Sequence, residues 1–159
     1  TLWSDIRNPK YIIEQLECFK NLEVQFWGNT QTYLVLKELG YERLYCGFAD
    51  QREVENIIVA SDYLLNISND NIVQTPSKIF EYISYGKPII NVIKNENDKT
   101  MKLINRYGNG VNIMEGSKRM TELSAFLEKK IEQVPSARIM ELFNEYTPQA
   151  LSKKLYDIM

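Results

Sequence analysis

Short apolar runs rich in β-branched residues alternate along this chain with longer segments in which apolar residues recur every three or four positions. The longer segments have the spacing of amphipathic helices, and the short runs have the length of buried strands. Such alternation is typical of α/β proteins, in which helices cover both faces of a parallel sheet. We therefore expect a Rossmann-like, three-layer α/β/α domain with a mainly parallel sheet.

Gly and Pro residues mark many of the boundaries between these expected elements. The expected strands cover residues 24–27, 44–46, 62–67, 88–93 and 111–114. The expected helices cover residues 9–20, 30–39, 51–60, 76–86 and 98–107, and a helical tail over 118–159 is broken near Pro135 and restarts at Thr147-Pro148. The length of 159 residues suits a single domain spanning 1–159. Because doubly wound domains begin with a strand, we expect a strand to precede this sequence and the chain to be a fragment.

Composition excludes several kinds of chemistry. The sequence has no His, which excludes a Ser-His-Asp triad and a His metal site. Its 19 Lys and Arg against 21 Asp and Glu give a net charge of −2, which argues against nucleic acid as a partner. Any chemistry therefore depends on carboxylates, cations, hydroxyls, backbone amides or a partner.

Cys18 and Cys46 are the only cysteines and lie far apart, so the sequence contains neither a CxxC motif nor a disulfide framework. A reducing, cytoplasmic environment is the expectation, and we expect both thiols to be buried as small apolar side chains. No apolar run approaches the ~18 residues that a membrane-spanning helix needs.

In open α/β sheets, ligands bind beyond the carboxyl ends of the strands. Residues 1–7, 28–30, 47–50 and 68–78 should line that edge here. The sequence contains neither the GxGxxG dinucleotide fingerprint nor the GxxxxGK[ST] phosphate loop. Any ligand must therefore be held by another arrangement.

The segment around Pro76 is the richest of these. Pro76 suits the first position of a helix, which leaves the amides of Ser77 and Lys78 free for an anion. Glu81 shares a helix face with Ser77 and Lys78, at a spacing that suits contact with sugar hydroxyls. The alternative is an amphipathic surface helix in which Lys78 and Glu81 form an ion pair.

Residues 76–90, PSKIFEYISYGKPII, resemble the P-x-K-x-x-E-Y-x-x-x-G-K-P signature of the C-terminal domain of glycosyltransferase family 4 and related GT-B enzymes. Residues 60–65, ASDYLL, are similar to the family's preceding strand. Weaker likeness extends over residues 6–9, 24–28, 45–48 and 107–111. The resemblance implies the C-terminal half of a GT-B fold, in which a helix over 145–159 packs towards an N-terminal, acceptor-binding domain.

This resemblance implies a site for a nucleoside diphosphate sugar such as a UDP-sugar. Glu81 would accept hydrogen bonds from the ribose, and Arg7 with Lys78 would hold the diphosphate. The remaining donor-binding candidates are the backbone around Thr75, Pro76 and Ser77, and Gly28, Gly47 and Phe48 near the base. The family often has a Glu-x7-Glu pair, whose earlier Glu would lie eight positions before Glu81; that position is Val73 here. No metal or other cofactor is expected.

The implied function is transfer of a sugar from a nucleoside diphosphate sugar to an acceptor, as in polysaccharide biosynthesis. The catalytic groups are expected in the N-terminal domain, so this chain alone should bind donor but transfer little. Cytoplasmic placement follows, with peripheral contact at the inner face of a membrane through the other domain. Two alternatives stay open: a non-enzymatic flavodoxin-like binding or regulatory module, and half of a GT-B nucleotide-sugar epimerase.

Overall fold

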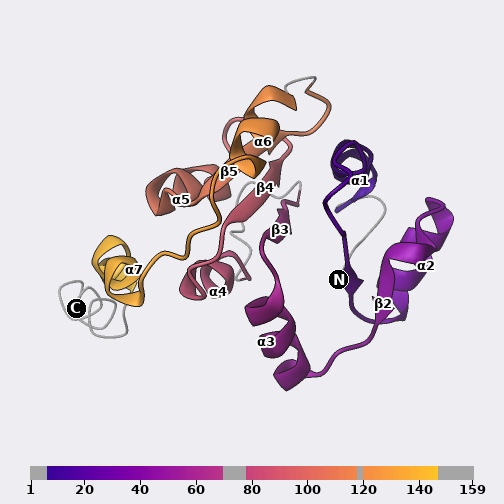
Figure 1. Ribbon diagram of the computed structural model, residues 1–159, viewed down its shortest axis with the longest axis horizontal. Helices are drawn as coiled ribbons and strands as arrows, with labels where there is room; N and C mark the ends of the chain where they lie inside the picture. The colour runs from indigo at the N-terminus through magenta and orange to yellow at the C-terminus, as the bar shows by residue number, and fades with distance from the viewer. Residues whose placement is uncertain (1–6, 70–77, 118–119, 147–159) are drawn as a thin grey trace, which may run out of the picture.

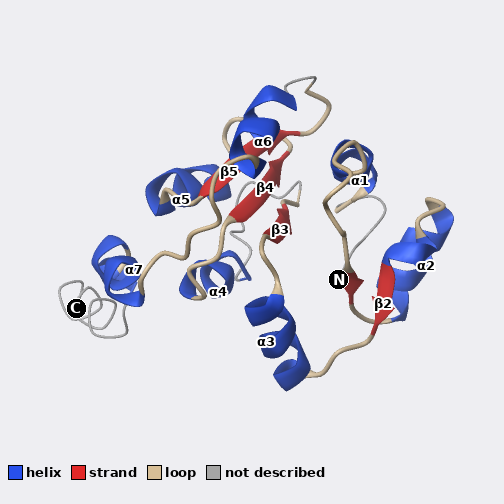
Figure 2. Ribbon diagram, in the orientation of Figure 1, coloured by secondary structure: helices blue, strands red, loops and turns tan. Residues whose placement is uncertain are grey.

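The computed structural model describes residues 7–69, 78–117 and 120–146. The chain folds as an α/β protein in which every strand is parallel to its neighbours (Figures 1 and 2). The strands are β1 (Phe26–Trp27), β2 (Tyr45–Gly47), β3 (Leu64–Ile67), β4 (Ile89–Ile93) and β5 (Gly110–Met114). The helices are α1 (Lys10–Leu16), α2 (Thr30–Glu38), α3 (Gln51–Ala60), α4 (Lys78–Ser84), α5 (Lys99–Tyr107), α6 (Met120–Leu127) and α7 (Ser136–Leu142), with 3-10 turns η1 (Glu42–Leu44) and η2 (Asn144–Tyr146). This result confirms the expected fold class.

The strands form two sheets rather than the single sheet that the sequence suggested. Strands β3, β4 and β5 pair in that order, with Ile90 opposite Leu65 and Val111. Strands β1 and β2 form a separate pair, in which Phe26 lies opposite Tyr45. Among the described residues, no ladder joins β1 to β3. In the described chain, the five predicted strands therefore form two parallel sheets, which is consistent with the expected Rossmann-like α/β/α domain.

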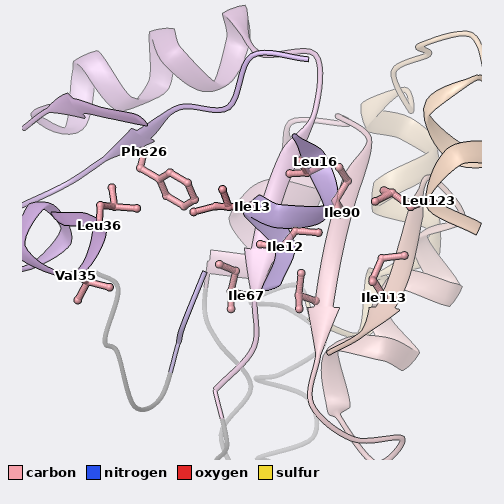
Figure 3. Close-up of a cluster of buried hydrophobic side chains, with 11 residues drawn as sticks. Ile12, Ile13, Leu16, Phe26, Val35, Leu36, Ile67, Ile90, Ile113 and Leu123 are labelled. Carbon is pink, nitrogen blue, oxygen red and sulfur yellow. The ribbon is translucent and has the colours of Figure 1, made fainter. Parts of the chain in front are cut away.

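Helices cover both faces of this layer, and two apolar clusters fill the space between helices and strands. The first cluster holds buried side chains of α1, α2 and α6 against the strands, and Figure 3 shows Ile13 near Phe26 and Leu16 near Ile90. The second cluster holds side chains of α3, α4, α5 and α7. Because strand side chains alternate between faces, Ile90 of β4 joins the first cluster and Ile89 joins the second.

Several elements are shorter than the sequence suggested. Helix α1 ends at Leu16 instead of near residue 20, because the Phe19 N–H bonds back to the Leu16 carbonyl at 3.0 Å in a tight turn. Strand β1 begins at Phe26 instead of Val24. The tail forms α6, α7 and η2 up to Tyr146, and the expected C-terminal helix lies almost entirely outside the described residues.

Both thiols are exposed, so the prediction that they are buried was wrong. Cys18 lies in the turn after α1, and Cys46 lies at the centre of β2. Strand β2 contains no buried residue, because its pairing with β1 covers its edge without enclosing its faces. The apolar spacing around Cys46 in the sequence resembles a buried strand, but only the tertiary structure shows how little covers it.

Candidate functional site

The carboxyl ends of the parallel strands define one edge of the molecule, and the described candidates Gly28, Gly47 and Phe48 follow the first two strands there. Arg7 precedes α1, and Lys78 and Glu81 lie on α4. The other predicted residues, Thr75, Pro76, Ser77 and the position of Val73, lie outside the described residues.

Arg7 and α4, which are more than seventy positions apart in the sequence, interact through Tyr82. Burial of the phenol raises the pKa of Tyr82, the charge of Glu81 raises it further, and the positive charge of Arg7 lowers it. An electrostatic effect of Arg7 on Tyr82 requires the guanidinium to lie near α4. The charge of Arg7 therefore acts within electrostatic range of Tyr82, on the helix that carries Lys78 and Glu81.

Helix α4 separates its polar and apolar residues as the sequence indicated. Lys78 and Glu81 are exposed, while Ile79 and Ile83 are buried in the second apolar cluster. Phe80 is half-buried and packs against this cluster. The exposed cation and carboxylate lie one helical turn apart, on the side of α4 that a ligand can reach.

Gly28 and Gly47 meet through their backbones, as the Gly28 N–H donates to the Gly47 carbonyl at 2.9 Å. The Gly28 carbonyl also accepts a hydrogen bond from the Tyr45 hydroxyl, at 2.9 Å. A Cβ at Gly28 would lie 2.5 Å from the Thr32 hydroxyl oxygen, so glycine is needed here for the close approach of α2. The backbone N–H of Gly28 is therefore already used within the fold and is not free to bind a phosphate.

Among the described residues, Phe48 is the most exposed of the large apolar side chains, with 71% of its surface accessible. It directly follows Gly47, whose φ of +117° bends the backbone at the end of β2 in a way that suits glycine. A Phe at this position can either pack in the core or present its ring to the base of a nucleotide. Its exposure removes the core-packing alternative and leaves a ring accessible at the carboxyl edge.

At three helices that begin at this edge, a side-chain cap binds one of the first backbone amides. The Asn29 side chain accepts from the Thr32 N–H at the start of α2, and Asp98 accepts from the Thr100 N–H at the start of α5. At α3, Asp50 and Glu53 form a complete capping box. These termini are satisfied by caps, so they are poor anion sites.

Gly86, Lys87 and Pro88, near the end of the segment 76–90 that carries the family resemblance, have a structural role in this fold. Lys87 is buried, and its Nζ donates to the Val59 carbonyl at 2.7 Å, near the end of α3. A cation at a helix C-terminus interacts favourably with the helix dipole. Pro88 lies directly before β4, away from the carboxyl edge. The part of the motif that can serve a ligand is therefore its beginning.

The sequence analysis missed the segment after β4. Lys94 directly follows Ile93, the last residue of that central strand, and so lies at the same edge as the other candidates. The available signal was the rule that residues after a strand's carboxyl end line the ligand edge. The short run Lys94–Asp98 leads into α5 there.

Within residues 7–69, 78–117 and 120–146, the structure contains no group of three Cys, Asp or Glu side chains arranged to hold a metal ion. None of the helices in those same ranges has the length and apolar character needed to cross a bilayer. When compared with known proteins, the chain matches no family model, no curated protein and no solved structure.

Proposed function

We propose that this chain is the donor-binding half of a GT-B glycosyltransferase, which transfers a sugar from a nucleoside diphosphate sugar. The observation that carries the proposal is the electrostatic effect of Arg7 on Tyr82 of α4, the helix that holds Lys78 and Glu81, since the resemblance assigns Arg7, Lys78 and Glu81 to diphosphate and ribose.

In this proposal, Arg7 and Lys78 bind the oxygens of the diphosphate, and Glu81 accepts hydrogen bonds from the ribose hydroxyls. During transfer, the bond between the anomeric carbon and the diphosphate oxygen breaks, and the electron pair stays on that oxygen. The two cations stabilise the charge that develops there, which is how such a site accelerates loss of the leaving group. The N-terminal domain binds the acceptor and takes up its proton. This chain on its own is therefore expected to bind the nucleotide sugar but to transfer little.

Calorimetric titration of the chain with UDP, GDP and ADP tests the proposal. We expect one of the three to bind, and we expect Arg7→Ala, Lys78→Ala and Glu81→Ala each to weaken binding about tenfold or more, since each removes a charged hydrogen-bonding group. The matched control is Lys129→Ala, because Lys129 lines a cavity with Tyr63 and Pro88 at the opposite edge of the sheet.

Binding that survives all three substitutions would contradict the assigned site. Absence of binding by a folded chain would favour the flavodoxin-like module instead. If binding is found, the epimerase alternative is separated by an assay on a protein that contains both domains, because an epimerase changes the free nucleotide sugar without an acceptor.

A further inference from the structure

We propose that Asn109 is a site of spontaneous deamidation, in which water replaces the nitrogen of the side-chain amide, and that this change releases the chain segment that Asn109 holds. That segment covers residues 128–135, which connect α6 to α7 without helix or strand, and we call it the edge segment. It is bound to residues that precede β4 and β5, at the edge of the sheet opposite the candidate ligand site. The inference does not depend on the proposed function.

Asn109 is followed by Gly110, and no other asparagine in the sequence is followed by glycine. Deamidation begins when the backbone nitrogen of the next residue attacks the side-chain carbonyl carbon of the asparagine. A side chain on that next residue hinders the attack, and glycine has none. The sequence therefore makes Asn109 the most susceptible asparagine of the chain.

Gly110 is required by the packing around β5. It is the first residue of that strand and lies opposite Ile89 of β4. A Cβ on Gly110 would lie 2.8 Å from the Ile89 carbonyl oxygen and 2.8 Å from the Ile104 Cγ2 of α5, which is closer than van der Waals contact allows. The fold therefore keeps the residue that makes Asn109 reactive.

The side chain of Asn109 serves the fold as a hydrogen-bond donor. Its Nδ2 donates to the Glu132 carbonyl at 2.8 Å and to the Gly86 carbonyl at 3.4 Å. The Gly86 carbonyl also accepts from the Val134 N–H at 2.8 Å, so the edge segment is bound both by a side chain and by the backbone. Both partners of Asn109 are acceptors, and an ionised aspartate has no side-chain proton to donate. Loss of the amide therefore removes the side-chain anchor.

Water can reach this amide. Asn109 is half-buried, and it lines a cavity of about 310 Å³ together with residues 129–132 of the edge segment. A cavity of this size holds several water molecules, and the side chains of Asn109 and Glu132 offer them polar partners. The water that deamidation consumes is therefore available at the site.

The reaction needs no reactant besides water. The Gly110 nitrogen forms a bond to Cγ of Asn109, the bond between Cγ and Nδ2 breaks, and Nδ2 leaves as ammonia with the proton of the Gly110 amide. Water then opens the resulting cyclic imide at either carbonyl carbon. One product is aspartate, and the other is isoaspartate, in which the main chain passes through Cγ.

Both products weaken the attachment of the edge segment. Each has a carboxylate in place of the donating amide, and Lys129 and Lys130, which line the same cavity, attract this carboxylate away from the two carbonyls. Isoaspartate also adds a carbon to the main chain directly before β5, where the Ile89 N–H donates to the Asn109 carbonyl at 3.0 Å. Deamidation therefore disturbs the start of β5 as well as the edge segment.

The folded structure slows the attack. The hydrogen bonds of Nδ2 fix the side chain, and the bond from the Ile89 N–H fixes the carbonyl of Asn109. The Gly110 nitrogen reaches Cγ only when the side chain turns, which requires the Nδ2 bonds to open. We therefore expect the rate to follow local opening of the edge segment, which needs less free energy than global unfolding.

Peptide mapping by mass spectrometry tests the site. The chain is incubated in mildly alkaline buffer, with and without a denaturing concentration of guanidinium chloride, and the deamidated fraction of each asparagine is followed over time. In the folded chain, we expect Asn109 to react at least about threefold faster than Asn105, which is exposed but followed by Arg106. In denaturant, we expect Asn109 to react about tenfold faster again, since the hydrogen bonds that hold it are lost.

Hydrogen exchange tests the release. Asn109→Asp provides the aspartate product as a uniform sample, and Asn105→Asp is the matched control, because it adds the same charge at an exposed position. The Asn105 side chain accepts from the Asn112 amide at 2.8 Å, and a carboxylate accepts equally well. We expect the Val134 amide to exchange at least about fivefold faster in Asn109→Asp than in the wild type, and at the wild-type rate in the control.

Deamidation of Asn109 in the folded chain that is no faster than that of Asn105 would overturn the modification site. Equal rates for Asn109 with and without denaturant would show that the fold does not hold its side chain. Unchanged exchange of the Val134 amide in Asn109→Asp would show that the edge segment stays bound. Either of these two results would contradict the release, and because no nucleotide is used, both are separate from failure of the donor site.

Discussion

The two sheets of this molecule differ in how completely they are enclosed. All residues of β4 are buried, because this strand has a strand on each side and helices on both faces. Strand β2 has no buried residue, and its central side chain, Cys46, is exposed. Both sheets are parallel, but β4 has a strand on each side, whereas β1 and β2 pair only with each other among the described strands. Stability should therefore be concentrated in the three-stranded sheet.

The three-stranded sheet also contains a polar ladder. Asn66, Asn91 and Asn112 are register partners on adjacent strands. The Asn66 amide donates to the Asn91 side-chain oxygen at 2.6 Å, and the Asn91 amide donates to that of Asn112 at 2.7 Å. Asn91 also donates to the Thr100 hydroxyl at 3.0 Å, which connects the ladder to α5. Buried polar groups that are fully paired in this way favour one register over its alternatives.

Among the tests of how differently the two sheets are enclosed, the largest effect is expected from Ile90→Ala in β4. Ile90 is 3% exposed and lies in the first apolar cluster, so its truncation leaves a cavity and should lower the free energy of unfolding by about 4 kcal/mol. The matched change in the other sheet is Cys46→Ala, for which we expect less than about 0.5 kcal/mol. Urea unfolding measures both, and comparable losses in the two sheets would refute the contrast.

The next effect is expected from Asn91→Leu. This substitution removes the acceptor of the buried Asn66 amide and one of the partners of the Thr100 hydroxyl, which keeps Ser68 and Asp98, and it should cost about 2–3 kcal/mol in urea unfolding. The control is Asn105→Ala, since exposed Asn105 accepts from Asn112 at 2.8 Å but can be replaced by water. A loss for Asn91→Leu no greater than that of the control would mean that the ladder does not stabilise the sheet.

The smallest effect is a dependence on alkaline pH through Tyr107 of α5. Burial raises the pKa of Tyr107 to about 12, and its hydroxyl donates to the Lys87 carbonyl at 2.9 Å. The unfolded chain ionises this group near pH 10, so its contribution to stability is complete below that pH and is lost as the pH rises towards 12. The urea midpoint of the wild type should therefore fall more steeply between pH 10 and pH 12 than that of Tyr107→Phe. Parallel profiles for the two proteins would contradict this assignment.

Local signals in the sequence were sufficient for most of the elements. The run at residues 88–93 predicted β4 because a continuous β-branched stretch suits a strand that is buried on both faces. Asp98 and Gly108, a cap and a left-handed terminator, agree with the expected limits of α5. The length of β1 was overestimated because strand pairing, which apolar pattern does not report, extends over Phe26 and Trp27 only.

The candidate site was predictable in part for the same reason. The spacing of α4 placed Lys78 and Glu81 on the exposed face, since helical periodicity fixes which residues share a face. The sequence could not show that Arg7 acts electrostatically on Tyr82, because interactions between residues distant in sequence depend on how the chain crosses the sheet. It also could not show that the amide of Gly28 is already bound by Gly47.

The sequence by itself determined the order of helices and strands, the α/β class and the amphipathic faces of the helices, because these follow from the periodicity of neighbouring residues. The tertiary structure alone decided that β1 and β3 do not pair, that Cys46 is exposed while Ile90 is enclosed, and that Arg7 acts electrostatically on Tyr82 of α4. These features depend on which edges and faces meet in space, and such long-range contacts are not encoded in any local stretch of the chain.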